Sequence, residues 1–130
     1  MIIAVDFDGT IVEHDFPRLG RPLPGAIEWL KRFQEAGGLL ILLTMRSDGP
    51  QIGRKYLTDA VNYCRENGVE FWQVNENKEQ DDWTSSRKVY AHTYIDDAAA
   101  GVPLKDGSID WDAIGPLVLA MIQKRKAVTA

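Results

Sequence analysis

Apolar residues along the chain occur in short continuous runs separated by longer stretches with helical spacing. The continuous runs Ile2–Val5, Leu39–Leu43 and Thr93–Ile95 predict strands, and Val69–Val74 predicts a weaker one. A run without polar alternation is typical of a strand that is buried on both faces, as in a parallel sheet. The pattern therefore predicts four strands in a mostly parallel sheet.

Three stretches with apolar residues at helical spacing predict helices. They are Gly25–Gly37, Ile52–Gly68 and the segment that follows Asp110. Glycine is common just after a helix and aspartate just before one. In the third stretch, Gly115-Pro116 is expected to delay the helix or to kink it. The segment Asn75–Ser86 is polar and is expected to be irregular.

The alternation of strands and helices favours an α/β fold. We expect a three-layer sandwich around the parallel sheet. The chain has 130 residues, about the length of one domain, so we expect a single domain over residues 1–130. Hydrophobic residues make up 45% and charged residues 26%, which are ordinary globular values and exclude a disordered chain or a coiled coil.

Charge and cysteine content exclude several classes of function. The formal net charge of −4 argues against tight non-specific binding of nucleic acids. The single cysteine, Cys64, excludes an intramolecular disulfide framework and a multi-cysteine zinc site, and it fits a reducing compartment. We find no signal-peptide pattern and no apolar run long enough to span a bilayer, so we expect a soluble, cytoplasmic protein without a membrane partner.

Polar residues follow three of the predicted strands. They are Asp6 and Asp8 after the first strand, Thr44 after the second, and Asp96 and Asp97 after the fourth. The carboxyl ends of parallel strands meet at one edge of a sheet, where ligands bind. Several carboxylates at one place repel one another unless a proton or cation lies between them, which favours Mg²⁺. The alternative is that each aspartate pair caps a helix or closes a turn.

These residues resemble the motifs of the haloacid dehalogenase (HAD) superfamily of phosphohydrolases. Asp6-Phe7-Asp8-Gly9-Thr10 is similar to the first motif, and Thr44 to the second. Lys88, eight residues before Asp96, resembles the third-motif lysine that leads into an acidic fourth motif. The resemblance covers nearly the whole chain and implies a HAD-type, Rossmann-like core. The segments between the motifs are too short for a cap domain, as in small capless proteins of bacteria and phage.

The resemblance implies a phosphatase mechanism with a covalent intermediate. Asp6 would be the nucleophile that forms an aspartyl-phosphate, and Asp8 would protonate the leaving oxygen and then activate water. Thr44 would donate a hydrogen bond to the phosphoryl group. Lys88 would pair with Asp6 and stabilise the charge of the transition state. Lys78 is a rival for the lysine role.

The same resemblance implies which residues would hold Mg²⁺. The ion would be bound by Asp6, by Asp8 through its backbone carbonyl, and by Asp96, with Asp97 acting directly or through water. Two further residues, Thr10 and Arg46, are candidate substrate contacts. Thr10 would also support the turn after the first strand, and the alternative for Arg46 is an ordinary surface arginine.

The substrate is expected to be a small phosphorylated molecule or the phosphorylated end of a macromolecule. The site would be covered by the loop from Glu13 to Pro24, which includes Arg18 and Arg21, or by a second subunit in a homo-oligomer. Two alternatives to the phosphatase stay open on the same scaffold. One is a non-catalytic module, and the other is a Mg²⁺-dependent module that processes phosphate groups or the ends of nucleic acids.

Overall fold

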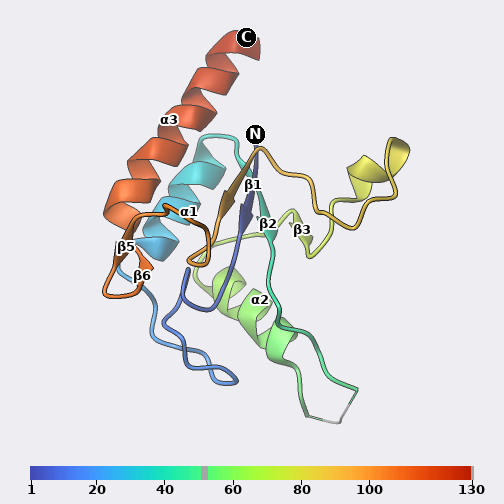
Figure 1. Ribbon diagram of the computed structural model, residues 1–130, viewed down its shortest axis with the longest axis vertical. Coiled ribbons are helices and arrows are strands. Elements are labelled where there is room, and N and C mark those ends of the chain that lie inside the picture. Colours follow the sequence, from blue (N-terminus) through green and yellow to red (C-terminus); the bar gives the residue numbers. More distant parts are fainter. Residues whose placement is uncertain (51–52, 130) are drawn as a thin grey trace.

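A computed structural model describes residues 1–50 and 53–129 of the chain (Figure 1). Its strands are β1 (Ile2–Val5), β2 (Leu39–Leu42), β3 (Gln73–Val74), β4 (Thr93–Ile95), β5 (Leu104–Lys105) and β6 (Ser108–Ile109). Its helices are α1 (Ala26–Glu35), α2 (Tyr56–Glu66), the short 3-10 helix η1 (Lys78–Asp82) and α3 (Trp111–Thr129). Within these ranges, no helix is both long enough and apolar enough to cross a membrane.

Four of the strands form one parallel sheet in the order β3-β2-β1-β4, as the apolar runs predicted. The third strand is shorter than predicted, with only Gln73 and Val74 paired to β2. The chain passes from β1 outward to β2 and β3, and then returns to add β4 on the other side of β1. The direction of strand addition therefore reverses between β1 and β4, a place where α/β sheets bind ligands.

The main hydrophobic core joins one face of the sheet to all three α-helices. Ile3 and Val5 of β1 lie on this face with Leu40 and Leu42 of β2. The buried helix residues packed in the same core are Leu30 and Phe33 of α1, Ala60 and Cys64 of α2, and Ile114, Val118 and Ile122 of α3. Full burial of such side chains contributes about 1.5–3 kcal/mol each. This core holds β1 rigidly from strand to turn.

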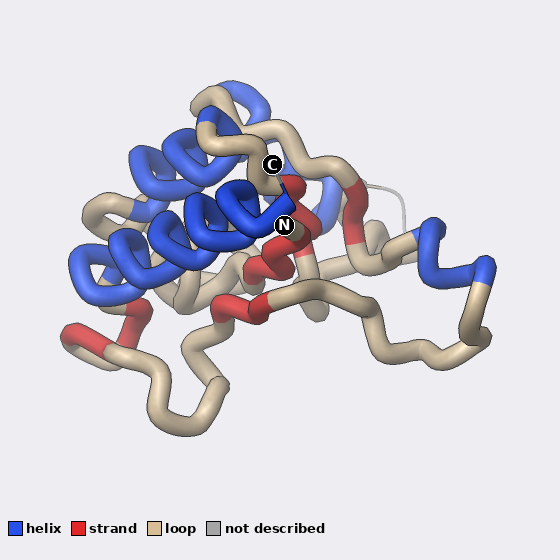
Figure 2. Tube along the Cα trace, turned by 90° about the horizontal axis from the view of Figure 1, so that it is seen from above, coloured by secondary structure: helices blue, strands red, loops and turns tan. Residues whose placement is uncertain are grey.

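On the opposite face of the sheet, the described residues that pack against it belong to strands and loops. Ala4 and Ile41 on this face pack with Ala91, and Trp72 and Val89 lie against them. Figures 1 and 2 show the long segment that includes η1 on the side of the sheet away from α1 and α3. The α/β class with a parallel sheet is thus confirmed, whereas a second helical layer is not.

The third helix begins directly after Asp110 and runs through Pro116, so the expected delay does not occur. The close packing of α1 and α3 explains why a weak helix former, Gly115, lies inside α3. A Cβ at this position would overlap the ring of Trp29 in α1. The second helix begins at Tyr56, and Ile52, where it was predicted to start, lies outside the described residues.

The close approach of α1 and α3 at Gly115 is testable. Gly115→Ala should lower the free energy of unfolding by about 1–3 kcal/mol, because the added methyl group overpacks the contact with Trp29. Alanine stabilises a helix more than glycine does, so without the Trp29 contact the substitution should raise the free energy of unfolding. A decrease therefore indicates that the contact is overpacked. Urea unfolding measures it, and Gly115→Ala combined with Trp29→Leu should recover much of the loss. A stabilised Gly115→Ala protein would contradict the packing.

Candidate metal centre

The candidate site lies where β1 and β4 end side by side. The register pairs Val5 with Ile95, and the backbone N–H of Asp6 donates to the carbonyl of Ile95 at 3.0 Å. Asp6 and Asp96 therefore follow the two strands at the same level of the sheet. The convergence predicted from strand ends is confirmed for both residues.

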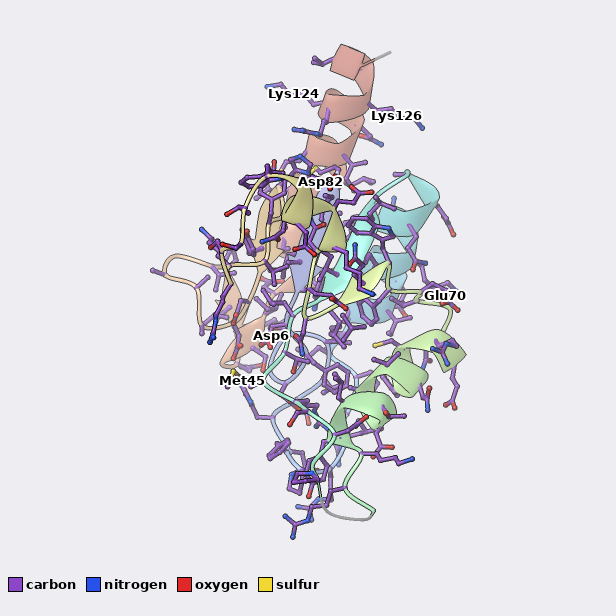
Figure 3. The ribbon with its side chains drawn as sticks, turned by 90° about the vertical axis from the view of Figure 1, so that its right-hand side faces the viewer. Asp6, Met45, Glu70, Asp82, Lys124 and Lys126 are labelled. Atoms are coloured by element: carbon purple, nitrogen blue, oxygen red, sulfur yellow. The ribbon has the colours of Figure 1, made fainter. Side chains whose placement is uncertain are left out.

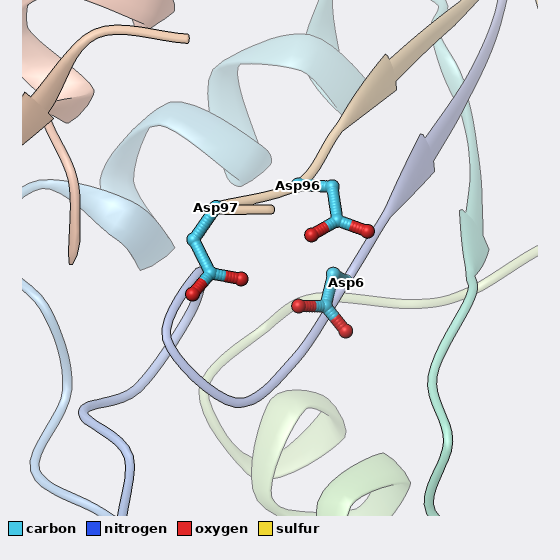
Figure 4. Close-up of side chains that lie close together, drawn as sticks. All are labelled: Asp6, Asp96 and Asp97. Atoms are coloured by element: carbon cyan, nitrogen blue, oxygen red, sulfur yellow. The ribbon is translucent and has the colours of Figure 1, made fainter. Parts of the chain in front are cut away.

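Three carboxylates form one group at this point. Asp6, Asp96 and Asp97 each offer an oxygen atom, and these atoms all lie within 4.8 Å of one another (Figure 4). The pKa of Asp6 is raised to about 7, mainly by burial and also by the negative charges of Asp96 and Asp97, while a hydrogen bond from the backbone N–H of Phe7 lowers it. An oxygen-only donor set under mutual repulsion fits a hard divalent cation such as Mg²⁺.

Asp97 is further held by His14, a residue to which the sequence assigned no role. His14 Nε2 lies 2.8 Å from a carboxylate oxygen of Asp97. Burial alone would raise the pKa of Asp97, but hydrogen bonds from His14 and Asp6 hold that pKa below its usual value. Gly9 permits this contact, because it has a φ of 80° and a Cβ there would overlap both His14 and Asp97.

Thr10 stabilises the turn after β1 through hydrogen bonds of its side chain and its backbone carbonyl. Its side chain is fully buried, and its hydroxyl oxygen accepts a hydrogen bond from the backbone N–H of Asp97 at 3.1 Å. The hydroxyl lies 3.3 Å from a carboxylate oxygen of Asp6 and can donate to it. The indole N–H of Trp111 donates to the Thr10 carbonyl at 2.7 Å. Thr10 thus supports the turn as expected, but its burial keeps it from contacting substrate.

Arg46 differs from both expectations, because it is neither a surface residue nor open to substrate. Its side chain is 1% exposed, and its Nε and Nη2 donate to the two carboxylate oxygens of Asp8 at 2.8 Å each. Three further hydrogen bonds from Nη1 and Nη2 reach backbone carbonyls, those of Pro17, Arg18 and Tyr56. All five donors of the guanidinium are therefore in use.

The ion pair with Arg46 holds the Asp8 carboxylate apart from the group formed by Asp6, Asp96 and Asp97. The three carboxylates close enough to share a cation are Asp6, Asp96 and Asp97, and Asp8 is not among them. An ionised Asp8 is needed to neutralise the buried guanidinium, so proton transfer by Asp8 requires this pair to open. The catalytic role of Asp8 and the metal contact through its backbone carbonyl stay predictions.

Thr44 lies at the same edge of the sheet, after β2. Its backbone N–H donates to the side-chain oxygen of Asn75 at 2.8 Å, and its hydroxyl oxygen accepts from the backbone N–H of Arg46 at 3.1 Å. The hydroxyl still has a proton to donate to a ligand. Asn75, at a φ of 54°, is a supporting residue that the sequence did not single out, although its place at the end of the third strand was a signal.

The two rival lysines lie in different surroundings. Lys88 is exposed, with its Nζ 5.7 Å from the centre of the Tyr94 ring. Tyr94 and Asp96 are two residues apart in extended chain, so Lys88 lies over the same face of β4 as Asp96. Lys78 lies 4.0 Å from Glu76 on a surface segment. Neither lysine pairs with Asp6 among the described contacts. The one geometric argument for Lys88 in the lysine role is that it lies over the same face of β4 as Asp96.

The basic residues near the end of α3 lie far from this group. In Figure 3, Lys124 and Lys126 are labelled at the upper end of the molecule, whereas Asp6 and Met45 are labelled in its middle part. Met45, next to Thr44, is 98% exposed. The surroundings of the carboxylates therefore come from the strand ends and the loops that follow them.

Comparison with known proteins places the chain beside one solved structure. A conserved protein coded by a locus from Bacteroides thetaiotaomicron is 37% identical to it, with a TM-score of 0.72 over 96% of this chain and 91% of that one. This chain belongs to the family of that conserved protein. No family model matches the chain, and no curated protein matches it. The relative's description names no activity, so function rests on the site.

The raised pKa of Asp6 predicts how the free energy of unfolding depends on pH in the absence of metal. Because folding raises the pKa of Asp6 from 3.8 to about 7, the native state binds the extra proton between these values. Its contribution to stability is present below pH 4 and is lost as the pH rises through 7. At pH 8 without metal, Asp6→Asn should therefore be more stable than the wild type, on the order of 1 kcal/mol after screening by solvent.

Thermal unfolding in EDTA at pH 5 and pH 8 measures this difference, which should shrink at pH 5. The low pKa of Asp97 affects stability only below pH 4 and does not overlap this window. Added Mg²⁺ should stabilise the wild type more than Asp6→Asn at pH 8. Equal stability of the two proteins at both pH values would show that folding does not raise the pKa of Asp6.

Arg46 should be a major contributor to stability. Arg46→Ala should lower the free energy of unfolding by about 3–5 kcal/mol, because it leaves the partly buried Asp8 without its counter-charge. Arg46→Lys should restore little of that loss, because one ammonium cannot satisfy acceptors on three sides. Arg18→Ala, which removes an exposed ion pair with Asp15, is the matched control and should change little. Urea midpoints compare the three variants.

Proposed function

We propose that this chain is a Mg²⁺-dependent phosphatase that hydrolyses phosphomonoesters through an aspartyl-phosphate on Asp6. The observation that carries the proposal is the group of Asp6, Asp96 and Asp97, whose oxygens lie within 4.8 Å of one another where strand addition reverses. The resemblance of residues 6–10 to the first HAD motif supports the same reaction, on a HAD-type core without a cap domain.

The reaction would proceed in two displacements at phosphorus. A carboxylate oxygen of Asp6 attacks phosphorus, an O–P bond forms, and the P–O bond to the leaving alcohol breaks. Water then attacks phosphorus, which releases inorganic phosphate and restores the Asp6 carboxylate. Mg²⁺ held by the three aspartates would offset their repulsion and attract phosphoryl oxygens. Asp6 must be ionised to attack, and its pKa of about 7 opposes this in the metal-free protein.

Proton transfer is assigned to Asp8, under the control of Arg46. The leaving alkoxide takes a proton in the first step, and water loses one in the second. Asp8 can move these protons only while its hydrogen bonds to Arg46 are open, because a neutral Asp8 leaves the guanidinium unpaired. Aryl phosphates, whose leaving groups need no proton, should therefore react faster than alkyl phosphates.

Charge on the transferring phosphoryl group would be stabilised from two directions. The hydroxyl of Thr44, at the end of the neighbouring strand, can donate to one phosphoryl oxygen. Lys88 would approach from the side of Tyr94, and its long side chain must swing from the tyrosine ring toward Asp6. Both assignments rest on the family resemblance and on the shared edge of the sheet.

A second candidate function is a non-catalytic Mg²⁺-binding module. The Asp8–Arg46 pair favours it, because the expected acid/base is tied in a bidentate ion pair. This candidate keeps the metal group of Asp6, Asp96 and Asp97 and predicts no phosphoenzyme. The two candidates therefore differ in a measurable product rather than in metal binding.

The phosphatase proposal predicts an activity that needs both metal and Asp6. Mg²⁺ should support hydrolysis of an aryl phosphate, EDTA should abolish it, and Asp6→Asn should lower kcat at least about 10³-fold while the protein stays folded. Asp59→Asn, on the exposed side of α2, is the matched control and should keep full activity. Rapid acid quench and mass spectrometry should find one phosphoryl group on Asp6.

Lysine variants in the same assay separate the two candidate lysines. Lys88→Ala should lower kcat by about 10²-fold, whereas Lys78→Ala should leave it nearly unchanged. The reverse order would move the lysine role to Lys78. Metal binding without turnover or phosphoenzyme, in wild-type protein with an intact circular dichroism spectrum, would support the non-catalytic module instead.

A further inference from the structure

A cavity of about 470 Å³ lies next to the candidate metal centre. One wall comes from the loop after β1, with Glu13, His14 and Leu23, and the other from the β5–β6 hairpin and the start of α3. Cavities of this size accommodate small-molecule ligands. Its two walls come from segments about ninety residues apart in the sequence, so only the fold creates it.

Three contacts join this cavity to the turn that follows Asp6. His14 lines the cavity and also contacts Asp97 at 2.8 Å. The backbone N–H of Ile109 donates to the carbonyl of Gly9 at 3.3 Å, and the indole of Trp111 donates to the Thr10 carbonyl at 2.7 Å. None of the three aspartates lines the cavity, so His14 is the side chain that links the cavity to their carboxylate group.

The lining has an apolar base and a negatively charged rim. Leu23, Ile109 and Trp111 are all buried. The charged residues of the lining are the four acids Glu13, Asp106, Asp110 and Asp112 and the one base Lys105. A ligand group with its own negative charge would be repelled there, whereas a hydroxyl or an ammonium group would find acceptors.

We propose that this cavity binds the leaving group of the substrate, and that the substrates are phosphomonoesters of neutral or cationic alcohols such as polyols and amino alcohols. This inference rests on the proposed phosphatase function. The phosphoryl group would lie at Asp6 with its charge offset by metal, and the rest of the molecule would extend past His14 into the cavity. Substrates with a second phosphate or a carboxylate would be disfavoured.

Three small alkyl phosphates that differ in charge test the inference. Values of kcat/KM for phosphoethanolamine and glycerol phosphate should exceed that for phosphoglycerate by about fivefold to tenfold. The triple variant Glu13→Gln, Asp106→Asn and Asp112→Asn should reduce this ratio to about one or two. Asparagine tolerates the left-handed backbone of residue 106, so the variant removes charge with little strain.

A second triple variant removes the same charge elsewhere. Glu35→Gln, Glu66→Gln and Glu70→Gln change exposed residues that precede β2 and β3, at the opposite edge of the sheet. This control should keep both the aryl phosphatase rate and the charge preference. If the two triple variants reduce the ratio equally, net charge sets the preference and the cavity proposal is wrong.

Calorimetric titration keeps the cavity proposal separate from the phosphatase proposal. Aminopropylphosphonate and carboxyethylphosphonate are not hydrolysed, and wild-type protein with Mg²⁺ should bind the amine about fivefold to tenfold more tightly. This preference without any turnover would overturn the phosphatase but keep the cavity as a ligand site. Turnover of aryl phosphate with no preference in either assay would overturn the cavity proposal alone.

Discussion

Repulsion among three carboxylates is the constraint on which the rest of this site depends. Asp6, Asp96 and Asp97 lie within reach of one cation, and burial with mutual repulsion raises the pKa of Asp6 to about 7. The fold holds these carboxylates together because β1 is paired on both sides and its Ile3 and Val5 belong to the core that includes residues of all three α-helices. The same three carboxylates are the group that could hold a metal ion, so the pH dependence of stability and any metal binding involve the same residues.

Supporting contacts around the carboxylates come from several separate segments of the chain. Thr10 bonds the backbone of Asp97, Gly9 leaves room for His14, and Trp111 ties α3 to the turn after β1. Arg46 holds Asp8 and the loop after it in one buried network. The carboxylate group, the neighbouring cavity and the Asp8–Arg46 pair are therefore joined through the turn after β1, and a substitution in one should alter the others.

Much of the fold was predictable because hydrophobic patterning decides local structure. The strands at Ile2–Val5 and Thr93–Ile95 were predicted to the residue, and the strand that begins at Leu39 ends one residue earlier than predicted. The meeting of Asp6 with Asp96 followed from the rule that parallel strands end at one edge. The covering of the second face of the sheet was not predictable, because the polar segment before β4 gives no signal of how Trp72, Val89 and Ala91 pack there.

The sequence by itself determined the four strands of the parallel sheet, the three α-helices and the gathering of acidic residues, because these depend on periodicity and strand direction. Only the tertiary structure decided that Arg46 is buried against Asp8, that His14 contacts Asp97, and that a cavity opens beside them. Such contacts join loops whose paths are set by packing across the whole molecule. A side chain's neighbours along the chain do not reveal which distant group will neutralise its charge.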